Sequence, residues 1–133
     1  MATAAAITGA KIPNNAAEDS YNILSALLGK DTKPIRNYTL HQTISLAMAI
    51  RRGQWKYLDH KGSGGNNYGR EGRWGMKQYA LPEKSPNAPG QLYDLANDPG
   101  ETTNLYFKYP EIVGELKEKL NEFKKNGRSA PKH

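Results

Sequence analysis

The feature that most constrains this fold is a strict alternation of residue types just before residue 53. Every second position from 44 to 50 is apolar: Ile44, Leu46, Met48 and Ile50. This period of two is typical of a strand with one buried face. Arg52-Gly53-Gln54 then predicts a tight turn, because glycine supplies its backbone torsions. Trp55-Lys56-Tyr57-Leu58 follows as the return strand, so the sequence predicts an antiparallel hairpin.

A second strong pattern lies near the C-terminal end. Pro110 suits the first turn of a helix, Glu111 favours the positive end of the helix dipole, and Gly127 suits a position just past its end. The apolar residues between them follow helical spacing and would share one face: Ile112, Val113, Leu116, Leu120 and Phe123. We expect this helix to pack on the sheet and the basic tail over 128–133 to fray.

Weaker signals complete the expected architecture. Residues 91–95 predict a strand, and the turn over 97–100 would place Gly100 where a special torsion is needed. A short strand is expected over 76–81. Residues 1–8 predict a helix ending at Gly9, and a second helix is expected from Asp19 or Ser20 to Gly29. The predicted fold class is α+β, with a small antiparallel sheet of about four strands and a long C-terminal helix packed on one face.

Composition narrows the classes of function. The 133 residues suffice for one domain, but only 37% are hydrophobic, which suggests a core completed by other surfaces. A formal charge of +6 favours anionic partners, and the absence of cysteine excludes disulfides and cysteine nucleophiles. The opening apolar run is far too short for a membrane span, and the basic residues form no single stripe. Neither a membrane nor nucleic acid is therefore an expected partner.

Two stretches resemble the C-terminal region of the sulfatase family: Ala49-Ile50-Arg51-Arg52-Gly53-Gln54-Trp55-Lys56-Tyr57, and Leu92-Tyr93-Asp94-Leu95-Ala96-Asn97-Asp98-Pro99-Gly100-Glu101-Thr102-Thr103-Asn104-Leu105. In the family, the second stretch is a strand ending in Leu-Tyr-Asp-Leu, an Asp-Pro-x-Glu turn, and Asn-Leu before the last helix. This sequence follows that pattern without a gap. The resemblance implies that residues 1–12 are the tail of an α/β sulfatase domain outside this chain and that residues 13–133 form the C-terminal subdomain.

The same resemblance implies that the chain carries no catalytic residue. Sulfatases use a formylglycine made from a Cys/Ser-x-Pro-x-Arg motif, beside a calcium ion. Here Thr32-Lys33-Pro34-Ile35-Arg36 has the spacing but begins with threonine, which cannot form the aldehyde. Formylglycine and calcium are therefore expected in the α/β catalytic domain of the same polypeptide, which is also the expected partner. The parent enzyme would be periplasmic or secreted, whereas the compartment of this chain is left open.

Four residues are candidates for contact with a sulfated substrate: His41, His60, Arg70 and Arg73. His41 precedes the hairpin strand, where several sulfatases place a side chain near the mouth of the substrate pocket. A protonated imidazole can donate a hydrogen bond to a sulfate oxygen. The other three lie in the glycine-rich segment, where such enzymes vary in specificity. A partly buried histidine for His41, and a solvated charged loop for the other three, remain open as alternatives.

The resemblance implies a function as the C-terminal subdomain of an enzyme that hydrolyses sulfate esters. Inactive alone, the subdomain would buttress the catalytic domain and wall the substrate cleft. Its apolar residues around Ala4–Ile7 and Leu24–Leu28 would face that domain, or support a dimer when exposed. The alternative is a free-standing binding module for anionic or sulfated glycans, which the charge of +6 also suits.

Overall fold

The computed structural model describes residues 1–43, 46–61 and 84–132. Its elements are, in chain order, α1 (Ala2–Thr8), α2 (Leu24–Leu27), β1 (Thr39–Gln42), β2 (Met48–Arg52), β3 (Trp55–Leu58), β4 (Gln91–Asp94) and α4 (Pro110–Asn126). They form two compact units, one of Met1–Asn37 with Asn121–His133 and the other of Tyr38–Leu120. Within the described ranges, no helix is long and apolar enough to cross a membrane.

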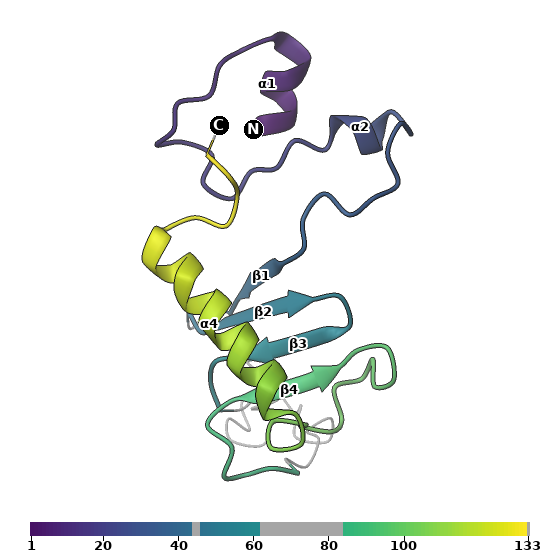
Figure 1. Cartoon of the computed structure of the whole chain (residues 1–133), viewed down its shortest axis with the longest axis vertical. Helices are drawn as coiled ribbons and strands as arrows, with labels where there is room; N and C mark the ends of the chain where they lie inside the picture. The colour runs from purple at the N-terminus through teal and green to yellow at the C-terminus, as the bar shows by residue number, and fades with distance from the viewer. Residues whose placement is uncertain (44–45, 62–83, 133) are drawn as a thin grey trace, which may run out of the picture. The chain divides into compact units, whose positions relative to one another are not determined.

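The second unit contains an antiparallel sheet of four strands in the order β1-β2-β3-β4 (Figure 1). The register places Leu40, Ile50, Tyr57 and Leu92 in one row across the four strands. Because side chains alternate along a strand, the neighbouring row lies on the opposite face and consists of His41, Ala49, Leu58 and Gln91. The two faces of the sheet are thus set by the register.

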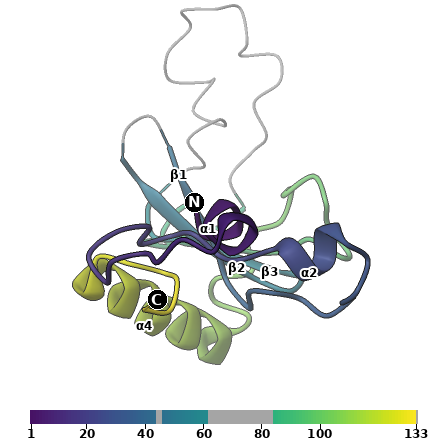
Figure 2. The same cartoon turned by 90° about the horizontal axis from the view of Figure 1, so that it is seen from above.

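The main core lies between the sheet and α4, which crosses one face of the sheet (Figures 1 and 2). The largest fully buried side chains come from both layers: Ile50, Tyr57 and Leu92 from the strands, Leu116 and Leu120 from the helix. Arg52 pairs with Glu115 across this interface. Full burial of a large apolar side chain is worth about 1.5–3 kcal/mol, so these five residues hold the helix on the sheet. The predicted α+β architecture is confirmed.

The strands differ in one respect from the sequence prediction. The hairpin of β2 and β3 is confirmed, with Gly53 in a left-handed conformation at φ 55°. The alternation, however, does not extend through Leu46, which has φ 63° and is 72% exposed. It lies in a turn in which the Thr43 carbonyl accepts a hydrogen bond from the Leu46 N–H. The chain therefore folds back there, β1 is a strand that the alternation did not predict, and the strand expected over 76–81 lies outside the described residues.

The Asp98 carboxylate holds the second half of the turn after β4. Asp98 accepts hydrogen bonds from the N–H and hydroxyl of Thr102, both at 3.0 Å, and from the N–H of Thr103 at 2.8 Å. The hydrogen bond from the Thr102 N–H is the main cause that lowers the pKa of Asp98 below its ordinary value of 3.8. Glu101 takes the left-handed torsion, at φ 53°, that was predicted for Gly100.

Buried Asn104 joins this turn to the outer edge of β4. Its side-chain oxygen accepts from the N–H groups of Leu92 and Tyr106, at 3.1 and 3.0 Å, and its amide donates to the Gly90 carbonyl. The Leu105 N–H donates to the Leu92 carbonyl at 2.8 Å. Polar backbone groups that an edge strand would leave unpaired are thereby satisfied.

In the first unit, α1 ends as predicted at Gly9, which has φ 72°. The second helix is much shorter than predicted, and neither Asp19 nor Ser20 caps it. The Ser20 hydroxyl accepts from the Ala2 N–H, and the Asp19 carboxylate accepts from the N–H and hydroxyl of Ser129. These side chains bind residues outside the predicted helix, and α2 begins only at Leu24, so the prediction of a helix from Asp19 or Ser20 was wrong.

Residues 128–130 of the C-terminal tail are hydrogen-bonded to the N-terminal part of the chain, so the prediction that the tail frays was wrong for this stretch. Ala130 is buried, and its N–H donates to the Glu18 carbonyl. The Ser129 carbonyl accepts from the Tyr21 hydroxyl at 2.6 Å, and Arg128 donates to the carbonyl of Asn14. A short basic tail is stable here because its polar groups find partners more than 100 positions earlier in the chain.

The helices of the first unit expose large apolar side chains. Ile7 is 65% exposed, Leu27 66% and Leu28 57%, and Ile23 is also exposed. We call these four the α1–α2 apolar residues. Ile7, Leu27 and Leu28 lie within the segments that the sequence predicted to be apolar and exposed.

Substituting Gly90 tests the close approach of β3 and β4. A Cβ atom at this position would lie 2.7 Å from the Leu58 carbonyl oxygen and 3.1 Å from the Tyr57 ring. We expect Gly90→Ala to lower the free energy of unfolding by about 1–3 kcal/mol, because backbone must shift. Gly114→Ala in α4 is the control: open space surrounds it, and we expect a gain of about 0.5–1 kcal/mol. Urea unfolding that showed no loss for Gly90→Ala would contradict this packing.

Asp98 predicts how stability changes in acid. Because its pKa is lowered in the folded chain, its contribution is complete above the ordinary value of 3.8 and is lost as the pH falls through the lowered value. We expect Asp98→Asn to unfold more easily at neutral pH and to lose less stability between about pH 5 and pH 2. The control is Glu118→Gln, at an exposed position of α4. Parallel pH profiles for the wild type and Asp98→Asn would refute the assignment.

Candidate functional site

The candidate site is the sheet face opposite α4. Of the predicted substrate-binding residues, His41 lies on this face, in β1, and is exposed. It pairs with Ala49, which pairs in turn with Leu58. Ala49, Leu58 and Tyr93 form a small buried cluster with Leu95 against it. His41 thus lies in the same row of the sheet as Ala49 and Leu58 of this buried cluster.

Basic residues extend this face along the strands. Arg51 and Lys56 belong to the row between Thr39 and Tyr93, on the same side as His41. The Lys56 ammonium lies 2.6 Å from Glu101, and this partly buried pair neutralises it. Arg51 is exposed, and its Nε donates to the Gly53 carbonyl at 2.8 Å, which leaves the rest of the guanidinium facing solvent. The exposed groups of this face that can donate to an anion thus include His41 and Arg51.

His60 follows β3 by two residues and is half-buried. Its Nδ1 lies 3.4 Å from the Lys61 carbonyl oxygen. Its Nε2 is shielded from solvent and has no hydrogen-bond partner among the described residues. Strand β2 separates β1, which carries His41, from β3. The other two candidates, Arg70 and Arg73, lie outside the described residues, so the structure does not show whether the four come together.

The carboxylates near the sheet serve structure. Asp94 accepts from the Asn97 side chain at 2.8 Å and from the Ala96 N–H at 3.1 Å, and the bond from Asn97 is the main cause that lowers its pKa. Asp59 accepts from the Tyr57 hydroxyl at 2.9 Å, and burial raises the pKa of that phenol. Among the described residues, no group of three His, Asp or Glu side chains is placed to hold a metal ion. The calcium and formylglycine expected of the parent enzyme stay predictions for its α/β domain.

Sequence reasoning missed Arg51 as a partner of His41. The alternation in β2 shows which residues share a face within that strand, but only the pairing with β1 places His41 beside them. It also missed Asn104, whose part in the family pattern is explained by its three hydrogen bonds, two of them buried and one partly buried. A buried asparagine between two strand-like segments carries no distinctive local signal.

Comparison with known proteins adds independent findings. No model of a known protein family matches the sequence. The N-acetylgalactosamine-6-O-sulfatase of Bacteroides thetaiotaomicron is 36% identical over 124 residues, which cover 93% of this chain and 22% of that protein. A solved structure described under the metabolism of multiple glycosaminoglycans by Bacteroides thetaiotaomicron is 32% identical with a TM-score of 0.67, and the match covers 93% of this chain and 24% of that one.

The same fold occurs in more distant proteins. The crystal structures of Ps i-CgsB, alone and in complex with k-i-k-neocarrahexaose, match with TM-scores of 0.53 and 0.56. Each is 21% identical, and each match covers 92% of this chain and 22% of the other. The chain spans less than a quarter of the length of the relatives it matches. It is therefore related in sequence and fold to the sulfatase family, as the C-terminal subdomain that its two motifs predicted.

Proposed function

We propose that this chain is the non-catalytic C-terminal subdomain of an enzyme that hydrolyses sulfate esters of glycosaminoglycans. One observation carries the proposal: 93% of the chain aligns at 36% identity with an N-acetylgalactosamine-6-O-sulfatase. The substrate class follows that relative, whose name specifies a sulfate at O6 of an N-acetylated amino sugar. In this proposal the formylglycine nucleophile and the calcium ion come from an α/β domain of the same polypeptide.

The α1–α2 apolar residues support a buttressing role. Exposed leucine and isoleucine side chains gain about 1.5–3 kcal/mol each when a partner buries them fully. Several polar groups of the first unit, by contrast, bind one another, as in the bonds of Asp19 to Ser129 and of Ser20 to Ala2. Its apolar side chains are the part of the unit that gains from a further surface, and the proposed surface is that of the α/β domain.

His41 and Arg51 support a role in walling the substrate cleft. Both are exposed on the sheet face opposite α4, in the rows that also hold the buried residues Ala49, Leu58 and Tyr93. A guanidinium and an imidazolium both donate hydrogen bonds to sulfate or carboxylate oxygens. In the proposed enzyme they would bind anionic groups of the substrate chain while the chemistry proceeds in the α/β domain.

A chimera tests this function directly. The corresponding region of the Bacteroides relative is replaced by this chain, and sulfate release from N-acetylgalactosamine 6-sulfate is measured by ion chromatography. We expect the chimera to hydrolyse the ester, and we expect neither this chain alone nor the relative without its C-terminal region to do so. Hydrolysis by the chain alone, or a chimera that folds normally but releases no sulfate, would overturn the proposal.

The chimera also tests the buttress. We expect Leu27→Glu to reduce the yield of folded chimera, because it places a charge in the proposed interface. Lys30→Gln changes the net charge by the same amount at a neighbouring exposed position and should leave the yield unchanged. Equal yields of folded chimera for the two variants would show that the α1–α2 apolar residues do not form the interface.

A substitution of the next residue, Gln42, serves as a control that separates substrate binding by His41 from any effect on folding. His41 and Gln42 are both exposed in β1 but lie on opposite faces of the sheet. On a sulfated oligosaccharide we expect His41→Ala in the chimera to raise KM about fivefold with little change in kcat, as for a lost binding contact. Gln42→Ala should change neither constant. Equal effects of the two substitutions would show that His41 acts only through the stability of β1.

A further inference from the structure

Residues 106–109 form a dense aromatic and basic segment immediately before α4. The rings of Tyr106 and Phe107 meet edge to face at a centroid distance of 5.3 Å. The rings of Tyr109 and Trp55 meet at 5.1 Å with an interplanar angle of 60°. Neighbouring positions in one turn thus hold three aromatic rings, and a fourth from β3 joins them. We call Trp55, Tyr106, Phe107, Lys108 and Tyr109 the aromatic turn.

The backbone of this turn is fixed. The N–H groups of Lys108 and Tyr109 both donate to the Leu105 carbonyl, at 2.9 and 3.2 Å. The Tyr106 N–H donates to the buried side chain of Asn104, and Leu105 is bonded to β4. A ligand would therefore meet a preformed backbone, and little backbone entropy would be lost on binding.

Phe107 is exposed although it sits on this rigid support. It is 61% exposed, whereas Trp55, Tyr106 and Tyr109 are each partly covered. Most of its surface is therefore not buried in this fold, and its described ring contact is the one with Tyr106. A large exposed aromatic side chain on a fixed turn is a feature of binding surfaces.

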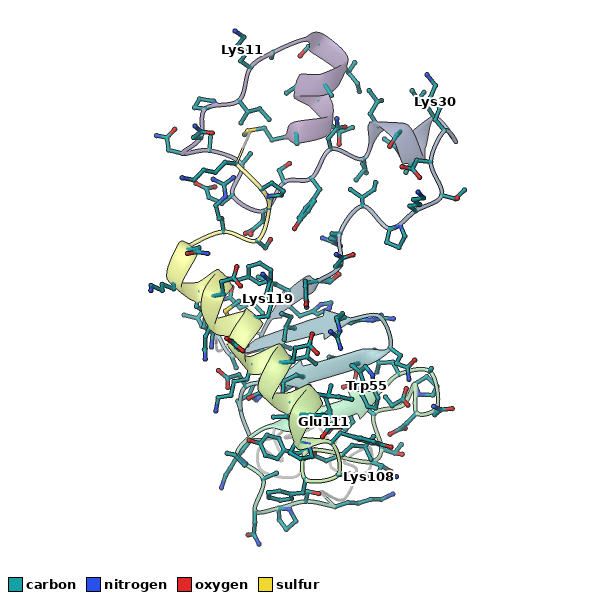
Figure 3. The ribbon with its side chains drawn as sticks, viewed as in Figure 1. Lys11, Lys30, Trp55, Lys108, Glu111 and Lys119 are labelled. Atoms are coloured by element: carbon teal, nitrogen blue, oxygen red, sulfur yellow. The ribbon has the colours of Figure 1, made fainter. Side chains whose placement is uncertain are left out.

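Charged side chains of both signs lie in and around this turn. The Lys108 ammonium is exposed and lies 5.4 Å from the centroid of the Tyr109 ring. The Lys84 ammonium donates to the Thr103 hydroxyl at 3.1 Å, next to Asn104. Glu111 opposes them from the first turn of α4. Figure 3 shows Trp55, Lys108 and Glu111 at the same end of the second unit, where α4 begins.

An aromatic ring beside an ammonium group matches the two surfaces of a sulfated sugar. The axial C–H groups of a pyranose form an apolar face that packs on an aromatic ring, and an equatorial or exocyclic sulfate projects at its rim. An ammonium at the edge of the ring then meets the sulfate. A single-stranded nucleic acid also combines stacking with anionic groups, but it would favour several cations along one track, and Glu111 interrupts such a track.

We propose that Phe107 and Lys108, positioned by the rest of the aromatic turn, bind a sulfated glycan. Phe107 packs on the apolar face of a sugar ring, and Lys108 contacts its sulfate. The choice of ligand rests on the proposed function, but the surface belongs to this chain and its binding is measurable without any hydrolysis.

Calorimetric titration of the 133-residue chain with a chondroitin 6-sulfate hexasaccharide tests this surface. We expect Phe107→Ala and Lys108→Gln each to weaken binding about fivefold, and Phe107→Leu to weaken it nearly as much because leucine lacks a flat face. Glu111→Gln should strengthen binding, since it removes the opposing charge. The matched control is Lys124→Gln, which removes one positive charge at another exposed position of α4. Thermal unfolding of each variant shows that the fold is kept.

The outcomes are separable. Loss of binding in Phe107→Leu and Lys108→Gln but not in Lys124→Gln supports the proposal, as does weaker binding of desulfated chondroitin. Equal losses of affinity for Lys108→Gln and Lys124→Gln would mean that binding is general charge attraction, and would overturn the proposal. Stronger binding of oligothymidine than of the glycan would also overturn it. So would the absence of any binding. These results do not depend on the chimera: an inactive chimera with intact glycan binding at Phe107 would overturn the proposed function alone.

Discussion

The fold of the second unit depends on one buried side chain, the amide of Asn104. It satisfies the N–H groups of Leu92 and Tyr106 and the carbonyl of Gly90, so it closes the outer edge of β4. An edge strand that lacks a partner is exposed to pairing with other chains, and a buried polar group without a partner costs about 1–3 kcal/mol. The same asparagine fixes the turn that leads into α4. The Leu-Tyr-Asp-Leu to Asn-Leu pattern is therefore a structural motif, because its polar residues are used to connect strand, turn and helix.

Local physics made much of this fold predictable. Period-two alternation located β2, the turn at Gly53 located β3 as its return strand, and helical spacing located α4. Gly9, Gly53 and Gly127 marked the ends and turns at which left-handed torsions occur. The errors arose where distant residues compete for the same polar group. The residues around Asp19 predict that it caps a helix, but its carboxylate accepts a hydrogen bond from Ser129 instead. No window of sequence contains both residues, and the ordered tail follows from the same bond.

The sequence predicted one residue of the candidate site, His41, but not how the site is arranged on the sheet. The sequence singled out His41 as a residue before a strand, but its closeness to Arg51 depends on the pairing of β1 with β2. That pairing in turn depends on the turn at Leu46, where an apolar residue takes a torsion and an exposure that its type does not suggest. The register of strand pairing determines which polar residues share a surface. Register depends on residues that are distant in the sequence, so a local pattern does not predict it.

Net charge is a poor guide to recognition by this chain, because several of its cations are already engaged. Lys56 is paired with Glu101, Arg52 with Glu115, and Arg128 donates to backbone carbonyls of the first unit. These groups stabilise turns and the contact of sheet with helix, and their charge is largely neutralised or held at fixed partners. In the proposed function, recognition of an anionic glycan depends on exposed side chains, His41 and Arg51 on the sheet and Lys108 next to the exposed ring of Phe107. Selectivity for a sulfated sugar follows more naturally from such pairs than from a diffuse field, since the apolar surface distinguishes a sugar ring from a simple anion.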